Sequence, residues 1–129
     1  MPITRKRAAA VLLALGLSLS IVLLLVSCSN PFNPRPKPIV RVSGGLAFGT
    51  APFTVAFDIS DSSDPNGEIV FFTFDFGDGS TPVERTDLSE LIEHTYENAG
   101  SYFAKLTATD NEGATASFSL VISAHEPAS

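Results

Sequence analysis

The sequence is poor in the residue types that form disulfides and carry nucleophilic catalysis. Its 129 residues include one cysteine, Cys28, and two histidines, His94 and His125. A single cysteine cannot form an internal disulfide, so the folded part of the chain must be stable without one. Nucleophilic catalysis needs a nucleophile, a base and an orienting group in contact, and His125 lies in a polar C-terminal tail that we expect to fray. We therefore expect no catalytic residues and no enzymatic activity.

Basic residues are also scarce. Lys and Arg together number 8 against 14 Asp and Glu, which gives a formal net charge of −6. An acidic chain is repelled by the phosphates of nucleic acids and by anionic lipid headgroups. This balance excludes nucleic acid as a partner. It suits divalent cations or basic partners, and it also keeps a small exported domain soluble.

The N-terminal segment has the layout of a secretory signal. Three basic residues in Thr4–Arg7 precede an uncharged, Leu-rich run over residues 8–26. The run is close to the ~20 residues that span a membrane, so an uncleaved anchor helix is the alternative. Leu25–Cys28 resembles the lipobox of bacterial lipoproteins, in which an acylated cysteine becomes the new N-terminus. The resemblance implies a signal peptide over residues 1–27 and a lipid on Cys28.

A lipidated cysteine would fix the protein to the cell envelope, because more than one acyl chain gives stable anchoring. Ser29 follows the cysteine, which by resemblance to lipoprotein sorting favours the outer membrane over the cell membrane. Four prolines follow before Ile39, and such stretches prefer polyproline II. We predict a semi-rigid stalk over residues 28–38, although proline-rich segments also serve as docking ligands. The domain would face the periplasm or the exterior.

From Ile39 onward the apolar residues recur with a period of two, which predicts an all-β domain. The clearest strands are expected at residues 53–59, 69–76, 102–109 and 117–123. The segment 81–93 could be a weak strand or a single helical turn. An immunoglobulin-like β-sandwich has ~100 residues and about seven strands. We predict this fold over residues 39–124, preceded by the apolar helical signal segment and followed by a flexible tail over 125–129.

The stretch from Phe74 to Ser80, FDFGDGS, combines core residues with a turn. Phe74 and Phe76 fall on the same face of a strand as Phe72, which predicts that all three are buried. Asp75 and Asp78 could be an acid and base pair only if they faced a cleft ~5–9.5 Å apart. We expect both to accept hydrogen bonds from backbone amides of the turn instead.

Four blocks of sequence resemble successive blocks of a PKD (polycystic kidney disease) domain. They are SDPNGEI at 63–69, FDFGDG at 74–79, HTY at 94–96 with GSY at 100–102, and LTATDNEGA at 106–114. The blocks occur in the order of the family, and the similarity covers about residues 39–123. Two positions depart from the usual pattern: Phe74 stands where the family usually has Trp, and Asn66 where it often has Asp.

The resemblance implies a sandwich that acts in binding or as a spacer and not in chemistry. Asp64, Asn66 and Asp110 match positions where some PKD domains hold calcium, with further oxygens from the N-terminal edge strand. Calcium takes six to eight oxygen ligands. The loop with Asp64 and the turn with Asp110 must then lie at the same end of the sandwich. This would not be an EF-hand, because with Gly67 at the sixth loop position the twelfth is Thr73 and not Glu.

Two functional classes remain open for a monomeric, membrane-anchored protein of this kind. As an interaction module, it would present Phe71 and Phe103 to a polysaccharide or an envelope protein, because both alternate out of phase with the core aromatics. As a structural spacer, it would need only an anchor, a stalk and a stable fold, which calcium could stabilise. A contiguous aromatic patch on one sheet face separates the two classes.

Overall fold

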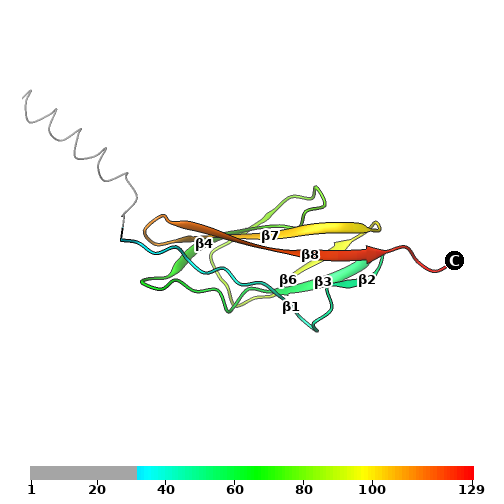
Figure 1. Cartoon of the computed structure of the whole chain (residues 1–129), viewed down its shortest axis with the longest axis horizontal. Helices are drawn as coiled ribbons and strands as arrows, with labels where there is room; N and C mark the ends of the chain where they lie inside the picture. Colours follow the sequence, from blue (N-terminus) through cyan, green and yellow to red (C-terminus); the bar gives the residue numbers. More distant parts are fainter. Residues whose placement is uncertain (1–31) are drawn as a thin grey trace, which may run out of the picture. The chain divides into compact units, whose positions relative to one another are not determined.

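Residues 32–129, the part of the chain that the computed structural model describes, fold into two β-sheets packed face to face (Figure 1). The smaller sheet has the order β1-β3-β6, with β1 at Arg41–Val42, β3 at Phe53–Asp58 and β6 at Ile92–Tyr96. The larger sheet has the order β2-β8-β7-β4-β5. Its strands are β2 at Phe48–Thr50, β4 at Ile69–Asp75, β5 at Val83–Arg85, β7 at Gly100–Asp110 and β8 at Thr115–His125. The predicted immunoglobulin-like sandwich is confirmed.

The predicted signal segment and Cys28 lie outside the described residues. Within residues 32–129 the structure contains no helix that is long and apolar enough to cross a membrane.

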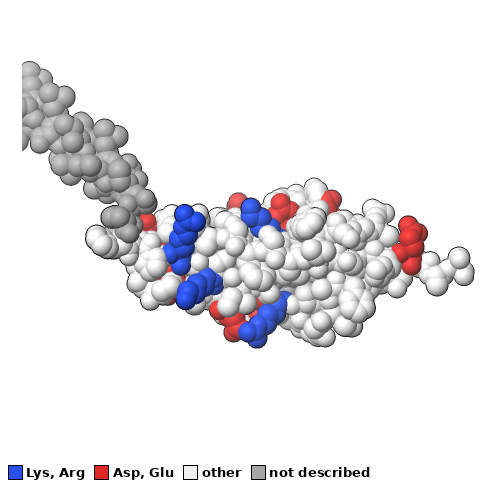
Figure 2. Space-filling view, in the orientation of Figure 1, with Lys and Arg blue, Asp and Glu red and all other residues white. Residues whose placement is uncertain are grey.

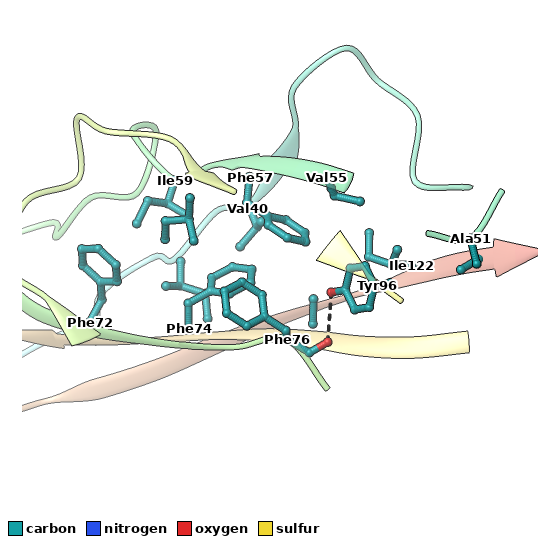
Figure 3. Packing of buried hydrophobic residues seen from close by; sticks show 14 residues of the cluster. Val40, Ala51, Val55, Phe57, Ile59, Phe72, Phe74, Phe76, Tyr96 and Ile122 are labelled. Atoms are coloured by element: carbon teal, nitrogen blue, oxygen red, sulfur yellow. Dashed lines mark hydrogen bonds between the residues drawn. The ribbon is translucent and has the colours of Figure 1, made fainter. Parts of the chain in front are cut away.

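The core between the sheets is built from alternating side chains, as the period of two requires. Phe72, Phe74 and Phe76 project from β4 and the turn after it, and at most 3% of each is exposed. The Phe74 ring lies 4.7 Å from the ring of Phe57 on the opposite sheet. Figure 3 shows these rings facing one another across the core, with the Tyr96 hydroxyl donating to the Phe76 carbonyl at 3.0 Å. The predicted burial of the three phenylalanines is confirmed.

The turn after β4 requires glycine at position 77. Gly77 has a φ of 80°, a conformation that glycine adopts without penalty. A Cβ atom at this position would also collide with the backbone of Phe103 on β7. Gly77 therefore allows β4 to turn while its backbone passes directly against β7.

Sequence periodicity found the long strands and missed the short ones. The unassigned segment 81–93 contains β5 and the first residues of β6, and two further short strands, β1 and β2, precede β3. β2 pairs in parallel with β8, whereas the other strand pairs are antiparallel. β8 also runs through His125, whose carbonyl accepts a hydrogen bond from the Ala51 amide at 2.8 Å. This histidine is part of the sheet and not of a frayed tail.

The described part of the proline-rich segment lies against the sandwich. Lys37 and Ser63 exchange two backbone hydrogen bonds of 2.7 and 3.1 Å, and Pro36 and Pro38 are buried. The Ser62 hydroxyl accepts a hydrogen bond from the Ile39 amide at 2.9 Å and donates one to the Ile39 carbonyl at 3.0 Å. The compact unit begins at Phe32, before the expected start at Ile39.

Candidate functional site

The loop between β3 and β4 and the turn between β7 and β8 meet at one end of the sandwich. The Asn111 amide donates to the Glu68 carbonyl at 3.0 Å, and the Asn111 side-chain oxygen accepts from the Glu68 amide at 3.2 Å. A side chain at Gly67 would collide with Asn111 and press on a carboxylate oxygen of Asp64. The structure thus brings Asp64 and Asp110 to the same end, as a calcium site requires.

Asp110 is buried, with 1% of its surface exposed. Its Oδ1 accepts from the amides of Glu112 at 2.9 Å and Ala114 at 2.8 Å, and its Oδ2 accepts from Nδ2 of Asn33 at 2.8 Å. Burial alone would raise the pKa of Asp110, but these hydrogen bonds lower it below its usual value. The carboxylate is therefore held in its charged form.

Asp64 lacks the hydrogen bonds that stabilise Asp110. Both of its carboxylate oxygens are shielded from solvent and have no hydrogen-bond partner, and the same is true of the side-chain oxygen of Asn33. Burial raises the pKa of Asp64, and the negative charges of Asp110 and Glu112 raise it further. Orphaned buried oxygens are rare and costly in native proteins, so this cluster is short of a positive charge.

The donor set fits a hard divalent cation such as calcium, which binds carboxylate and amide oxygens. Asp64, Asp110 and Asn33 would supply side-chain oxygens, and backbone or water oxygens would complete the six to eight that calcium takes. Among residues 32–129, no three Asp, Glu, His or Cys side chains form a group that could hold a metal by themselves. A cation site here would therefore also need the Asn33 amide oxygen, which is buried without a partner.

Asn66, the third residue expected in the calcium site, lies at the rim. Its Nδ2 donates to a carboxylate oxygen of Glu112 at 3.0 Å. The amide beside the buried carboxylates comes from Asn33 instead. Sequence reasoning expected oxygens from the N-terminal strand but did not identify Asn33, because it lies 77 residues from Asp110 along the chain.

A second candidate site is an exposed apolar patch on the outer face of the larger sheet, which we call the distal patch. Its members come from three neighbouring strands and the residues before β2: Leu46 is 57% exposed, Phe48 58%, Phe103 68% and Val121 46%. Phe103 is paired directly with Val121, and Phe48 with Ser123. Because Ile122 and Ala124 are buried, their alternating neighbours in β8 face outward, and so does Phe48.

Phe71 and Phe103 lie on the same outer face but not in one patch. Phe71 is 37% exposed and is paired with Thr109, six residues along β7 from Phe103, a separation of about 20 Å. The surface between them carries hydroxyl groups, including Thr107 and Ser117, whose oxygens lie 3.0 Å apart. The residues missed by sequence reasoning are Leu46, Phe48 and Val121. Val121 is paired with Phe103 across β7 and β8, whereas Leu46 and Phe48 come near it through the β2–β8 pairing, which spans most of the domain.

Asp75 and Asp78 accept hydrogen bonds from backbone amides of the turn after β4, as predicted. Asp75 accepts from the Gly77 amide at 2.9 Å, and Asp78 accepts from the Ser80 amide at 3.1 Å and the Ser80 hydroxyl at 2.6 Å. The other oxygen of Asp78 lies 2.6 Å from Nε2 of His94. The Ser80 hydroxyl therefore contacts the carboxylate and not the imidazole, which is not the arrangement of an activated nucleophile.

His94 packs between aromatic rings. Its ring is stacked on Phe76 at 3.9 Å and meets Tyr96 edge-on at 4.8 Å. Burial opposes ionisation of Asp78, but its hydrogen bonds with Ser80 and His94 lower the pKa of this aspartate to about 2. The hydrogen bond between Asp78 and His94 thus links the turn after β4 to β6 in the smaller sheet.

Known proteins resemble this sandwich both in sequence and in structure. A sequence model of the PKD domain matches residues 35–123. A microbial collagenase of Vibrio alginolyticus is 42% identical over 94 residues, which cover 71% of this chain and 11% of that protein. Collagenase ColA of Clostridium perfringens is 33% identical over 81 residues, which cover 63% of this chain and 7% of that protein. The chain thus spans about a tenth of the length of these relatives or less.

Two solved structures have the same fold. One belongs to work on carbohydrate-binding modules of the β-sandwich superfamily; it has a TM-score of 0.63 and 36% sequence identity, covering 74% of this chain and 36% of that one. The other is the PKD1 domain of the metalloprotease PrtV from Vibrio cholerae, with a TM-score of 0.57 and 25% identity, covering 70% of this chain and 98% of that one.

Proposed function

Because the chain belongs to the PKD domain family, we propose that it is a non-catalytic interaction module at the cell envelope. The relatives that it matches include collagenases, of which it spans only a small part, so the similarity concerns one module of a larger protein. The observation that carries the proposal is the distal patch, since contiguous exposed apolar patches mark interaction surfaces.

The chemistry of the outer face favours a neutral polysaccharide as the partner. Aromatic rings of the distal patch offer apolar surface for sugar C–H groups, and the hydroxyls of Thr107 and Ser117 offer hydrogen bonds. Lys105 is paired directly with Asp75 across β4 and β7, so these two opposite charges offset each other. A structure from work on carbohydrate-binding modules shares the fold at 36% identity, which supports the same class of ligand.

The position of the distal patch suits binding away from an anchored N-terminus. Residue 32 and the C-terminus lie at opposite ends of the sandwich (Figure 1). Asn33 contacts Asp110 at the end of β7, and Phe103 lies about 23 Å further along that strand. In the view of Figure 2, the Lys and Arg side chains gather toward the end where residue 32 lies. A chain tethered by its N-terminus would present the uncharged distal patch outward.

Replacing Phe103 with alanine is expected to weaken binding of the full chain to an insoluble polysaccharide at least tenfold. The ring is the most exposed side chain of the distal patch and pairs with Val121, so its loss removes much of the apolar surface of the patch. Leu91→Ala is the matched control, because Leu91 is 48% exposed but precedes β6 on the other sheet. Sedimentation with the polysaccharide measures both affinities. Equal binding by the Phe103 variant and the parent would contradict the proposal, and binding only to triple-helical collagen would identify a protein partner instead.

We propose that Cys28 anchors the module through a lipid. The basic start, the apolar run and the residues before Cys28 in the sequence support this proposal. Mass spectrometry of the mature protein is expected to show an acylated Cys28 as the first residue. An N-terminus that retains Met1 or Pro2 would show a transmembrane anchor instead.

We also propose that calcium binds between Asp64 and Asp110. The three buried oxygens without partners, two on Asp64 and one on Asn33, support this proposal. Bound calcium would satisfy these oxygens and neutralise the two carboxylates. In the alternative role of a structural spacer, the cation would stabilise the sandwich without any ligand at the distal patch.

A further inference from the structure

The edge of β8 that faces away from β7 is mostly unpaired. β7 pairs with β8 from Thr115 to Ala124, whereas β2 pairs only with residues 123–125 and lies beside the C-terminal end of the strand (Figure 1). The segment before β1 does not fill the gap, because it bonds to the β3–β4 loop and to Asp110. Within residues 32–129, the stretch 115–121 therefore has a neighbouring strand on one side only.

The backbone groups that point to this open edge belong to the odd-numbered residues of β8. The Ser123 amide donates to the Ala47 carbonyl at 2.9 Å, and the His125 carbonyl accepts from the Ala51 amide at 2.8 Å, so both residues bond toward the β2 side. Because the direction of these groups alternates along an antiparallel ladder, the odd positions of 115–121 point to the same side. Their N–H and C=O groups form an unpaired row, which is a template for another strand.

The open stretch of β8 lacks the features that protect the other sheet edges. Its sequence, TASFSLV, contains no charge, proline or glycine, and most of its residues are exposed. The edge strands β1, β5 and β6 each carry a charged residue, which is Arg41, Glu84 and Glu93 respectively. The uncharged edge strand β2 is only three residues long. Since charge and shortness keep edges from pairing, the stretch 115–121 is the edge suited to accept a strand.

We propose that two copies of this chain pair antiparallel through residues 115–121 of β8. The stretch is self-complementary when Phe118 lies opposite its own copy, because Ser117 then meets Ser119 and Thr115 meets Val121. These pairs join odd positions only, so every outward N–H and C=O finds a partner. A register shifted by one residue would pair odd with even positions and lose these bonds. The absence of charge also lets two chains of net charge −6 approach here without direct repulsion.

Phe118 adds an apolar contact to the proposed pair. It is paired with the buried Leu106, so its ring points to the core side of the sheet, yet 40% of its surface is exposed. Two opposed Phe118 residues would have Cα atoms about 4.5 Å apart, which brings their rings together. The outer faces of the two larger sheets would then form one surface that carries both distal patches. The pairing itself does not depend on polysaccharide binding.

Sedimentation equilibrium of the full chain in density-matched detergent micelles tests the pairing. The parent is expected to form dimers as its concentration rises. Ser119→Pro should weaken dimerisation at least tenfold, because it removes an outward N–H and leaves the bonds to β7. Ser117→Lys should have the same effect by placing a charge on the edge. Circular dichroism checks that both variants are folded.

Thr54→Lys is the matched control for Ser117→Lys. Thr54 is exposed on β3 of the smaller sheet, and its hydroxyl lies 2.8 Å from that of Thr95 on the paired strand, as the Ser117 hydroxyl lies 3.0 Å from that of Thr107. The control therefore adds the same charge and removes the same kind of contact away from β8. It should dimerise as the parent does.

Amide hydrogen exchange gives a pattern that edge pairing alone would produce. In the dimeric parent the Ser117 and Ser119 amides should exchange at least threefold more slowly than in the monomeric parent at low concentration. The Phe118 and Leu120 amides, which face β7, should exchange equally in both. A parent that stays monomeric at every concentration would refute the pairing. Dimers that persist in Ser117→Lys, or protection without this alternation, would show that β8 is not the interface.

Discussion

Replacing Phe74 with alanine is expected to lower the free energy of unfolding by about 3–5 kcal/mol. Phe74 is fully buried, and its ring lies 4.7 Å from Phe57 and 5.3 Å from Phe76. The substitution removes apolar contacts and leaves a cavity between the two sheets. Because small domains are stable by only about 5–15 kcal/mol, this loss is a large fraction of the total stability. Urea denaturation of the full chain in micelles, followed by circular dichroism, measures the change.

Phe103→Ala provides the internal control for this result. It is the same substitution in the same larger sheet, but Phe103 is 68% exposed on the outer face. Exposed substitutions usually change stability by about 0.5 kcal/mol or less. A Phe74 variant that unfolds at the same urea concentration as the Phe103 variant would show that the core is not centred on Phe74.

Replacing Asp64 with asparagine is expected to change stability in opposite directions with and without calcium. In EDTA the variant should melt at a higher temperature than the parent, because it removes a buried carboxylate that has no hydrogen-bond partner. In calcium the order should reverse, because only the parent gains from binding, by about 2.7 kcal/mol when calcium exceeds its Kd 100-fold. Thermal melting of both proteins in the two buffers measures the reversal.

The pH dependence of this difference follows from the direction of the pKa shift. The pKa of Asp64 is raised by burial and by the charges of Asp110 and Glu112, so its ionised form is disfavoured in the folded state. This penalty is complete above the raised pKa and disappears below the ordinary value of 3.8. The advantage of Asp64→Asn in EDTA should therefore shrink as the pH falls toward 3.8.

Asp61→Asn is the matched control for the Asp64 variant. Asp61 lies in the same loop and pairs with Arg41 at 2.9 Å, but both side chains are more than half exposed. Exposed ion pairs contribute little to stability, so this variant should melt with the parent in both buffers. The proposed site would be wrong if Asp64→Asn melted with the parent in both buffers, as Asp61→Asn is expected to. It would also be wrong if calcium raised the melting temperature of both variants equally.

The fold was predictable because its main features are local in sequence. Alternation of apolar and polar residues identified the long strands and the buried face of β4, and glycines marked the turn at Gly77–Gly79. The short strands β1 and β2 were not predictable, because two or three residues do not establish a period. β2 also owes its place to parallel pairing with the distant β8.

The candidate sites were only partly predictable from the sequence. Asp64 and Asp110 were expected from the resemblance to PKD domains, and contacts between their loops bring both residues to one end of the sandwich. Asn33 reached the same place through a proline-rich segment that the sequence predicted to be a stalk. The distal patch was recognised at Phe103 alone, since Leu46 and Phe48 become its neighbours only through the β2–β8 pairing.

Binding of the full chain to neutral polysaccharides tests the proposed function most directly. The wild-type protein, mixed with a panel of insoluble polysaccharides, is expected to sediment with at least one of them. The double variant Phe48→Ala/Phe103→Ala should stay in the supernatant while its circular dichroism and melting temperature match those of the wild type. Wild-type protein that stays in the supernatant with every polysaccharide, or a double variant that sediments equally well, would contradict the proposal.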